Sequence, residues 1–177
     1  MDRWLRMGLS ALVTGTAASV VSTAALALLA QGEGKTAFQP TNATSHWLHG
    51  DRAASHGEPD AAHTLIGYAT HHASALFWAV PFEAWLAARP PRTAGALLRD
   101  ACVMSAIAAV IDYGATPKRL TPGWELVLSK RSIAATYVAM ALGLAAGALV
   151  ARAWLGANAS ETGFDGGASR PLTPDAN

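Results

Sequence analysis

Residues 7–30 read MGLSALVTGTAASVVSTAALALLA and contain no charged side chain. About 20 apolar residues in a helix are enough to cross the roughly 30 Å hydrocarbon layer of a bilayer. Three later stretches also lack Asp, Glu, Lys and Arg, at residues 64–82, 101–111 and 132–151. With their flanking residues, the four stretches predict transmembrane helices at about 7–30, 63–87, 93–113 and 132–154.

The overall composition agrees with a membrane protein. Only 14% of the residues are charged and 51% are hydrophobic, whereas about 25% of a soluble protein is charged. The expected fold is all-α: an integral membrane four-helix bundle over residues 1–155, with a His-rich extramembrane loop at 31–63. A disordered tail rich in Gly, Ala, Ser, Asp and Pro is predicted over 156–177. The net charge of +1 excludes the strongly basic surface of a nucleic-acid-binding protein, so the expected partner is the lipid bilayer.

Small side chains recur at every fourth position in three of the predicted helices. The last helix contains the segment GLAAG at 143–147, and the first has Ala11, Gly15 and Ser19 at the same spacing. Helices in lipid associate through small residues, because these allow the backbones to approach closely. The pattern predicts a compact bundle and a homo-oligomer formed through small-residue helix faces.

Basic residues near the helices bear on orientation. Arg3 and Arg6 precede the first helix, and the short turn RPPR connects the second and third helices at 89–92. Because Lys and Arg concentrate on the cytoplasmic side, we expect both termini in the cytoplasm and the 31–63 loop outside. A cleaved signal peptide is the competing interpretation of the N-terminus, but the apolar run is long for one and lacks an Ala-x-Ala cleavage pattern. The single cysteine, Cys102, excludes an intramolecular disulfide.

All six histidines lie between residues 46 and 72. Imidazole is the commonest nitrogen ligand for metals and titrates near neutral pH. His46 and His49 would share one face of a helix, and His71 or His72 would supply a third ligand for zinc or copper. The sequence has no HExxH, CxxC or comparable ligand spacing, so no cofactor is predicted and a solvated loop above a structural bundle is the favoured interpretation.

Ionisable residues within the predicted helices suggest a proton or ion path. Placing such side chains in the hydrocarbon layer costs free energy, so they face neighbouring protein or water. His72 and Glu83 share one face of the second helix, about 16 Å apart along its axis. The simpler interpretation places Glu83 at the membrane interface, near Arg89 or Arg92.

The end of the third helix is expected on the same outer side as the start of the second. If the His-rich loop folds down over the second helix, then His63, Asp112 and Tyr113 would form a polar pocket with the histidines of that helix. If it does not, Asp112 pairs with a basic residue of the loop that follows it.

Three segments carry a resemblance to known proteins: NATSHWLHGD (42–51), HTLIGYATHHASALFWAVPFE (63–83) and DYGATPKRLTPGWELVLS (112–129). They resemble those of a group of small bacterial four-span inner-membrane proteins and, more faintly, the YagU-type inner-membrane proteins, all of unknown function. The resemblance covers about residues 1–152 and implies the bacterial inner membrane, but it supplies no catalytic residue and no substrate.

The sequence shows no nucleophile–base pair, phosphate-binding loop or cofactor motif. It therefore predicts an integral inner-membrane protein with a non-enzymatic accessory role. Two alternatives stay open. One is a metal-binding or metal-dependent membrane protein that uses the histidines of residues 46–72, and the other is a small oligomeric transporter or proton path.

Overall fold

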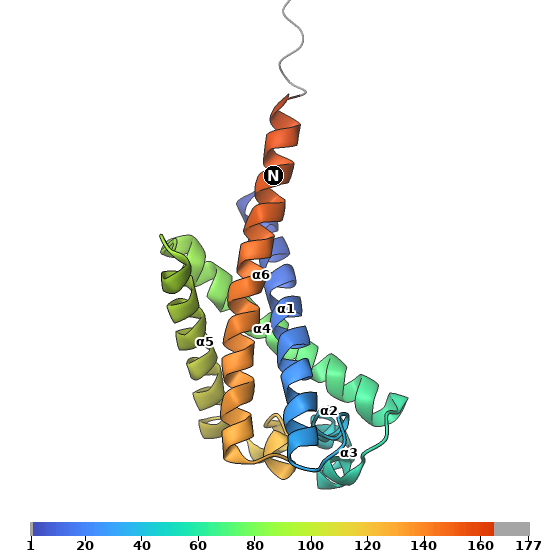
Figure 1. The fold of residues 1–177 in the computed structure, drawn as a ribbon. Coiled ribbons are helices and arrows are strands. Elements are labelled where there is room, and N and C mark those ends of the chain that lie inside the picture. Colours follow the sequence, from blue (N-terminus) through green and yellow to red (C-terminus); the bar gives the residue numbers. More distant parts are fainter. Residues whose placement is uncertain (1, 165–177) are drawn as a thin grey trace, which may run out of the picture.

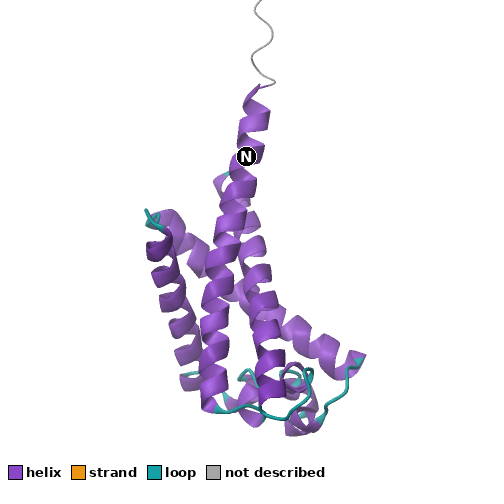
Figure 2. Ribbon diagram, viewed as in Figure 1, coloured by secondary structure: helices purple, strands orange, loops and turns teal. Residues whose placement is uncertain are grey.

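The structure is a computed structural model that describes the backbone of residues 2–164 and the side chains of residues 2–155. Four long helices make up most of this part of the chain: α1 (Arg3–Gly32), α4 (Ile66–Ala88), α5 (Ala94–Gly114) and α6 (Lys130–Phe164). The described residues contain no β-strand (Figure 2). The prediction of an all-helical fold is confirmed, and every helix boundary but the C-terminal end of α6 lies within about one turn of the predicted one.

Local signals set two of these helix ends. At the end of α1, Gly34 adopts a φ of 71°, and the N–H of Lys35 donates to the carbonyl of Ala30 over 2.8 Å. A left-handed glycine of this kind satisfies the last carbonyl groups of a helix. At the start of α5, the hydroxyl of Thr93 accepts a hydrogen bond of 3.1 Å from the N–H of Ala96, which is the usual role of an N-cap residue.

Helix α6 extends further than the sequence analysis predicts. Its backbone stays helical to Phe164, although a disordered tail is expected from residue 156. The composition of this segment resembles a tail, but the first proline beyond the helix is Pro171. Nothing before it removes a backbone donor and breaks the helix. Residues 165–177 of the predicted tail lie outside the described residues.

Three helices are long and apolar enough to cross a membrane: α1, α5 and the Lys130–Leu155 part of α6. Helix α4 has 23 residues, which is also a sufficient length, but it contains His71, His72 and Glu83 and is not among the three. The prediction of four membrane-length apolar helices is therefore confirmed for three of them.

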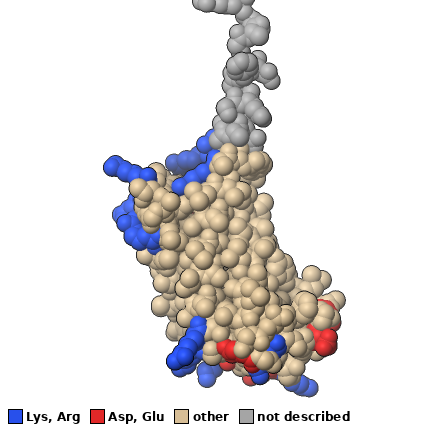
Figure 3. All heavy atoms as spheres, viewed as in Figure 1, with Lys and Arg blue, Asp and Glu red and all other residues tan. Residues whose placement is uncertain are grey.

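The arrangement of the helices is simple. Helices α1 and α6 lie side by side, α5 lies next to α6, and α4 crosses behind them at a steep angle (Figure 1). One end of the molecule carries the start of α1, the turn between α4 and α5 (residues 89–93) and the C-terminal part of α6 (Figure 1). We call it the turn end. The opposite end, formed by residues 33–65 and 115–129, is called the loop end. On the face drawn in Figure 3, charged side chains gather at these two ends and leave a broad band of uncharged residues between them.

The small residues bring the helices into backbone contact. A Cβ atom added at Gly143 or at Gly147 of α6 would lie 2.6 Å from a Cα atom of α1. A Cβ atom at Gly15 of α1 would lie 2.8 Å from a Cα atom of α4. The sequence pattern thus serves packing within one chain. Because a second copy cannot occupy the same positions, these glycines offer no surface for self-association, and a homo-oligomer would have to use other helix faces.

The loop end is a folded cap and not a solvated loop. It is built from the short segments α2 (Gln39–Ala43), α3 (His46–His49), η1 (Asp51–Ser55), η2 (Ala61–Leu65), η3 (Lys118–Leu120) and η4 (Trp124–Leu126). The two loops bind each other, since Trp124 Nε1 donates to Thr44 Oγ1 over 3.1 Å. The first loop also lies on α4, where a Cβ at Gly67 would fall 1.9 Å from the carbonyl oxygen of Thr41. The favoured sequence interpretation of a solvated loop is therefore wrong, because contacts between distant segments hold the loop down.

Candidate functional site

A cavity of about 240 Å³ lies at the loop end, between α4, the end of α5 and the two loops. Its lining includes Thr44, Trp47, Thr70, His71, Asp112 and Trp124. The volume is below the roughly 300–1,000 Å³ of pockets that hold drug-sized ligands, so a ligand of this cavity would be small. We call it the cap pocket.

Asp112 supplies the carboxylate of the cap pocket. It lies in the last turn of α5, and Tyr137 of α6 donates its hydroxyl proton to Asp112 Oδ2 over 2.7 Å. The Tyr137 ring packs against the rings of Trp124 and Tyr113, with centroids 5.7 and 6.3 Å apart. A carboxylate beside aromatic rings in a partly enclosed space is the arrangement that favours an organic cation.

His71 forms the inner wall of the pocket. It is 8% exposed, and its Nε2 atom lies 3.0 Å from Ser22 Oγ of α1. The ring meets Trp124 edge-on, with centroids 5.6 Å apart. On the open side, Trp47 Nε1 donates to Thr70 Oγ1 over 3.1 Å, which ties the first loop to α4. Side chains from four segments of the chain, namely α1, the first loop, α4 and η4, therefore fix the shape of the pocket.

The structure brings together only part of the pocket predicted from the sequence. His71 and Asp112 both line the cavity, as expected if the loop folds down. Tyr113 is adjacent but contacts Tyr137, and His63 belongs to a different cluster, described below. His72 points elsewhere and stacks on Tyr68, with ring centroids 5.8 Å apart.

Glu83 lies far from the cap pocket, toward the turn end. It is 8% exposed, and Thr14 of α1 donates to its Oε1 over 2.6 Å. The sequence analysis places this carboxylate at the interface near Arg89 or Arg92, but the structure buries it against a hydroxyl of α1. The reason is the tight contact of α1 with α4 at Gly15, directly beside Thr14.

The sequence did not indicate Trp47 and Trp124 as pocket residues, or Tyr137 as the hydrogen-bond partner of Asp112. Trp124 is 4% exposed and packs inward. The signal that could have found it is the preceding Gly123, whose φ of 81° turns the chain where a Cβ would lie 2.5 Å from the Ala43 carbonyl oxygen. A glycine next to a tryptophan does not by itself indicate such a contact.

The predicted metal ligands do not converge. His46 Nε2 lies 3.0 Å from the Thr121 carbonyl, and His49 Nε2 lies 2.9 Å from the Ala62 carbonyl. Each backbone carbonyl accepts the ring N–H, so these nitrogens already have partners. The His71 ring is hydrogen-bonded to Ser22 of α1, and the His72 ring stacks on Tyr68. The predicted set His46, His49, His71 and His72 is therefore not a metal site in this structure.

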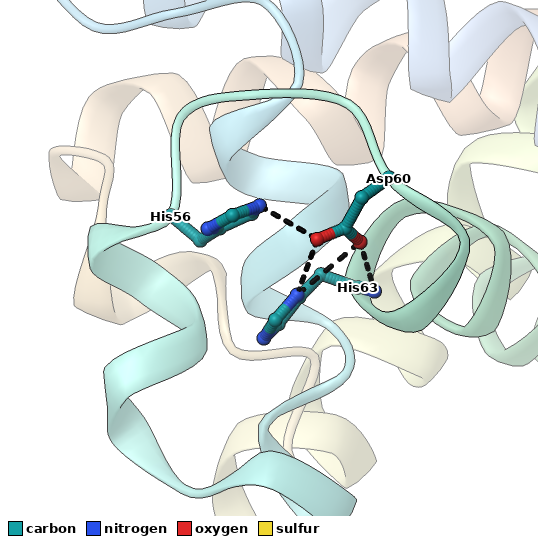
Figure 4. Close-up of side chains that lie close together, drawn as sticks. All are labelled: His56, Asp60 and His63. Carbon is teal, nitrogen blue, oxygen red and sulfur yellow. Dashed lines mark hydrogen bonds and ion pairs between the residues drawn. The ribbon is translucent and has the colours of Figure 1, made fainter.

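A different group can hold a metal. Among the described residues, His56, Asp60 and His63 place one ligand atom each within 4.8 Å of the others (Figure 4). Asp60 Oδ2 lies 2.8 Å from His56 Nε2 and 3.0 Å from His63 Nδ1. The backbone N–H and the imidazole of His63 lower the pKa of the Asp60 carboxyl to about 2, so Asp60 is ionised at any physiological pH. We call this group the His–Asp cluster.

Comparison with known proteins found no matching family model, no similar curated protein and no similar solved structure, so any functional assignment rests on the geometry described above.

Proposed function

We propose that this protein is an integral protein of a bacterial inner membrane, with four spans and an extracytoplasmic cap that binds a small organic cation. The role is that of a non-enzymatic accessory protein. The membrane part of the proposal is supported by the three apolar helices of membrane length. It is also supported by the band of uncharged residues between the two charged ends in Figure 3.

Helix α4 is proposed as the fourth span. Its two buried ionisable side chains, His71 and Glu83, face α1 and are hydrogen-bonded there. Its exposed side carries large apolar side chains, with Phe77 66% and Val80 49% exposed. Polar side chains within a membrane span are tolerated where they face neighbouring protein, and apolar ones face the lipid. The distribution of residues on α4 therefore fits a span despite its lower hydropathy.

The charges favour a cytoplasmic turn end. Its basic residues are all arginines: Arg3, Arg6, Arg89, Arg92, Arg99 and Arg152. The loop end mixes lysines and arginines with a similar number of acidic residues. Since basic residues near spans mark the cytoplasmic side, we place the start of α1 and the C-terminal part of α6 in the cytoplasm and the cap outside.

Cysteine labelling tests the topology. Cys102 is replaced by Ser, and single cysteines are introduced as Glu58→Cys at the loop end and Arg92→Cys at the turn end, both at exposed positions. A membrane-impermeant maleimide should label Glu58→Cys in intact cells and Arg92→Cys only after permeabilisation. The reverse pattern would refute the orientation, and recovery of the protein in the soluble fraction would refute the membrane assignment.

The single observation that carries the binding function is Asp112 in the cap pocket beside Trp47 and Trp124. Aromatic rings and a carboxylate together recognise ammonium groups through cation–π attraction and charge. The ammonium group could belong to a free molecule or to a lipid headgroup, because the pocket lies near the end of the spans.

A binding measurement tests this function. Purified full-length protein is titrated with choline, with its uncharged carbon isostere and with a short-chain phosphatidylethanolamine, and tryptophan fluorescence reports binding. We expect saturation by a charged ligand and no response to the isostere. Asp112→Asn keeps an acceptor for Tyr137 but removes the charge, and it should weaken binding by about tenfold or more. Asp51→Asn, at an exposed loop position with 83% accessibility, is the matched control. Equal responses of wild type and Asp112→Asn would refute the proposal.

A second candidate function is a proton path along the contact between α1 and α4. Ser19 Oγ is buried without a hydrogen-bond partner between the two bonded pairs, Ser22 with His71 and Thr14 with Glu83. His71 therefore takes the place that the sequence analysis gave to His72. The ionisable groups are about 18 Å apart along α4. Proton flux into proteoliposomes that is lost in Glu83→Gln would support this function, and flux equal to that of protein-free liposomes would exclude it.

A further inference from the structure

We propose that the His–Asp cluster is a binding site for a divalent transition-metal ion such as Zn²⁺. The ligand atoms are His56 Nε2, Asp60 Oδ2 and His63 Nδ1. This site is separate from the cap pocket, and it does not depend on the binding function proposed above.

The spacing of the ligand atoms suits a small ion. Zinc binds imidazole nitrogen and carboxylate oxygen at about 2.0–2.2 Å in tetrahedral geometry, so neighbouring ligand atoms lie about 3.3 Å apart. The Asp60 oxygen is 2.8 Å from one imidazole nitrogen and 3.0 Å from the other. These two distances therefore need to open by only a few tenths of an ångström to admit the ion.

The surroundings of His56 Nε2 also support a metal ion at this site. Its Nε2 atom is closed off from solvent and forms no hydrogen bond of acceptable geometry, although it lies 2.8 Å from Asp60 Oδ2. A buried ring nitrogen without a partner is unusual. An ion between the nitrogen and the carboxylate would satisfy both atoms.

Asn42 holds the ligand-bearing segment, residues 56–63, in place. Asn42 of α2 is fully buried, and its amide donates to the carbonyls of His56 and Glu58 over 2.8 and 2.9 Å. Its carbonyl accepts a hydrogen bond of 2.6 Å from Thr64 Oγ1. One side chain thus fixes the backbone before Asp60 and the Thr64 side chain after it. Support of this kind keeps ligands in position before the ion arrives.

The donor set and the access define the class of ion. Two imidazoles and one carboxylate favour Zn²⁺, Cu²⁺ or Ni²⁺ over Mg²⁺ and Ca²⁺, which prefer oxygen ligands. The three side chains are 23–36% exposed, so an ion can reach them from water. The fourth position would be taken by water.

Zinc titration of the full-length protein tests the site. The protein is purified in detergent, treated with a chelator and titrated with Zn²⁺ against a chromogenic competitor. Co²⁺ absorption in the visible range then reports the ligand geometry. We expect one equivalent to bind to the wild type. His56→Gln, Asp60→Asn and His63→Gln should each weaken binding by about tenfold or more. Asparagine can still cap η2, so Asp60→Asn should fold.

The controls are His72→Gln and Asp51→Asn, which remove the same kinds of side chain outside the cluster. They should bind Zn²⁺ as the wild type does. Zn²⁺ should also raise the melting temperature of the wild type but not that of His56→Gln, which keeps the Asp60 cap intact. Zinc binding that is unchanged in His56→Gln and His63→Gln would refute the site, as would a wild type that binds no more zinc than these variants.

Discussion

Tyr137 donates its hydroxyl proton to the carboxylate of Asp112 over 2.7 Å and thereby joins α6 to the last turn of α5. This hydrogen bond holds the carboxylate that lines the cap pocket. A second contact between the same helices, Ser105 Oγ to the Tyr137 carbonyl at 2.6 Å, lies close by. Tyr137 is therefore the residue through which α6 positions the pocket.

Tyr137→Phe removes this hydroxyl and leaves the ring. A hydrogen bond to a charged group contributes about 1.5–3 kcal/mol in soluble proteins and less, near 0.6 kcal/mol, between membrane helices. We expect the variant to lose about 1 kcal/mol of unfolding free energy, measured by denaturant titration in mixed micelles. Tyr68→Phe, whose ring only stacks on His72, should lose less. Equal losses in the two variants would show that the bond to Asp112 is not stabilising.

Gly147→Val tests the contact of α1 with α6. Because a Cβ at this position would lie 2.6 Å from a Cα atom of α1, the helices must separate. Overpacking of this kind costs about 1–3 kcal/mol. The matched control is Gly8→Val in α1, where an added Cβ meets nothing within 4 Å. A melting temperature that falls in the control as much as in Gly147→Val would contradict the backbone contact.

Glu33 links the end of α1 to the start of α6 and gives a pH prediction. Hydrogen bonds from the Ser129 and Ser132 side chains and from the Ser129 N–H hold the pKa of Glu33 below its ordinary value of 4.5. A carboxylate whose pKa is lower in the folded state stabilises the fold above the unfolded pKa, and this contribution disappears as pH falls through the folded pKa. Wild type should therefore melt above Glu33→Gln at pH 6, and the difference should shrink below about pH 4.5.

The control for this pH series is Glu58→Gln, an exposed carboxylate of the first loop. It should show the same melting temperature as wild type across the range. A constant difference between wild type and Glu33→Gln at every pH would mean that the charge of Glu33 does not matter.

Asn42→Ala should loosen the cap and weaken zinc binding together. The variant leaves the carbonyls of His56 and Glu58 without their donor inside the protein. Loss of several buried hydrogen bonds of this kind costs about 2–4 kcal/mol. Thr36→Val, which removes one exposed hydrogen bond to the Gly57 carbonyl, should cost less than about 1 kcal/mol. Hydrogen exchange of residues 55–65 would check the loosening, and full protection in Asn42→Ala would contradict it.

The long helices could be predicted from the sequence because their signals are local. Uncharged stretches such as 7–30 and 132–151 indicate the helices directly. The small-residue spacing of GLAAG indicates that α6 makes a close contact with another helix. The partner of that contact was not predictable, since any small-residue face would have served. The spacing predicted both a compact bundle and self-association, and the structure uses it for packing within the chain, between α1 and α6.

The site was predicted less well, because it depends on pairs distant in the sequence. Trp124 and Thr44 are 80 residues apart, and His46 and Thr121 are 75 residues apart. Helical spacing put His46 and His49 on one face, but the backbone carbonyls of other segments bind both rings. The His–Asp cluster depends on the extended Asp60, the N-cap of η2, which turns His63 back toward His56. No periodic pattern in the sequence encodes that turn.

The cap has a consequence for how the chain is made. The first loop can meet α4 early, through Trp47 and Thr70. Its contacts between Glu33 and Ser129 and between Thr44 and Trp124 form only after α5 and the segment before α6 have been synthesised. Until then the first loop lacks part of its contacts, and Asp112 lacks its hydrogen bond from α6 before Tyr137 arrives. Ribosome-bound chains that stop before residue 124 would thus carry α1, α4 and α5 without a complete cap. Completion of the cap therefore follows the synthesis of Trp124, and completion of the pocket wall follows that of Tyr137.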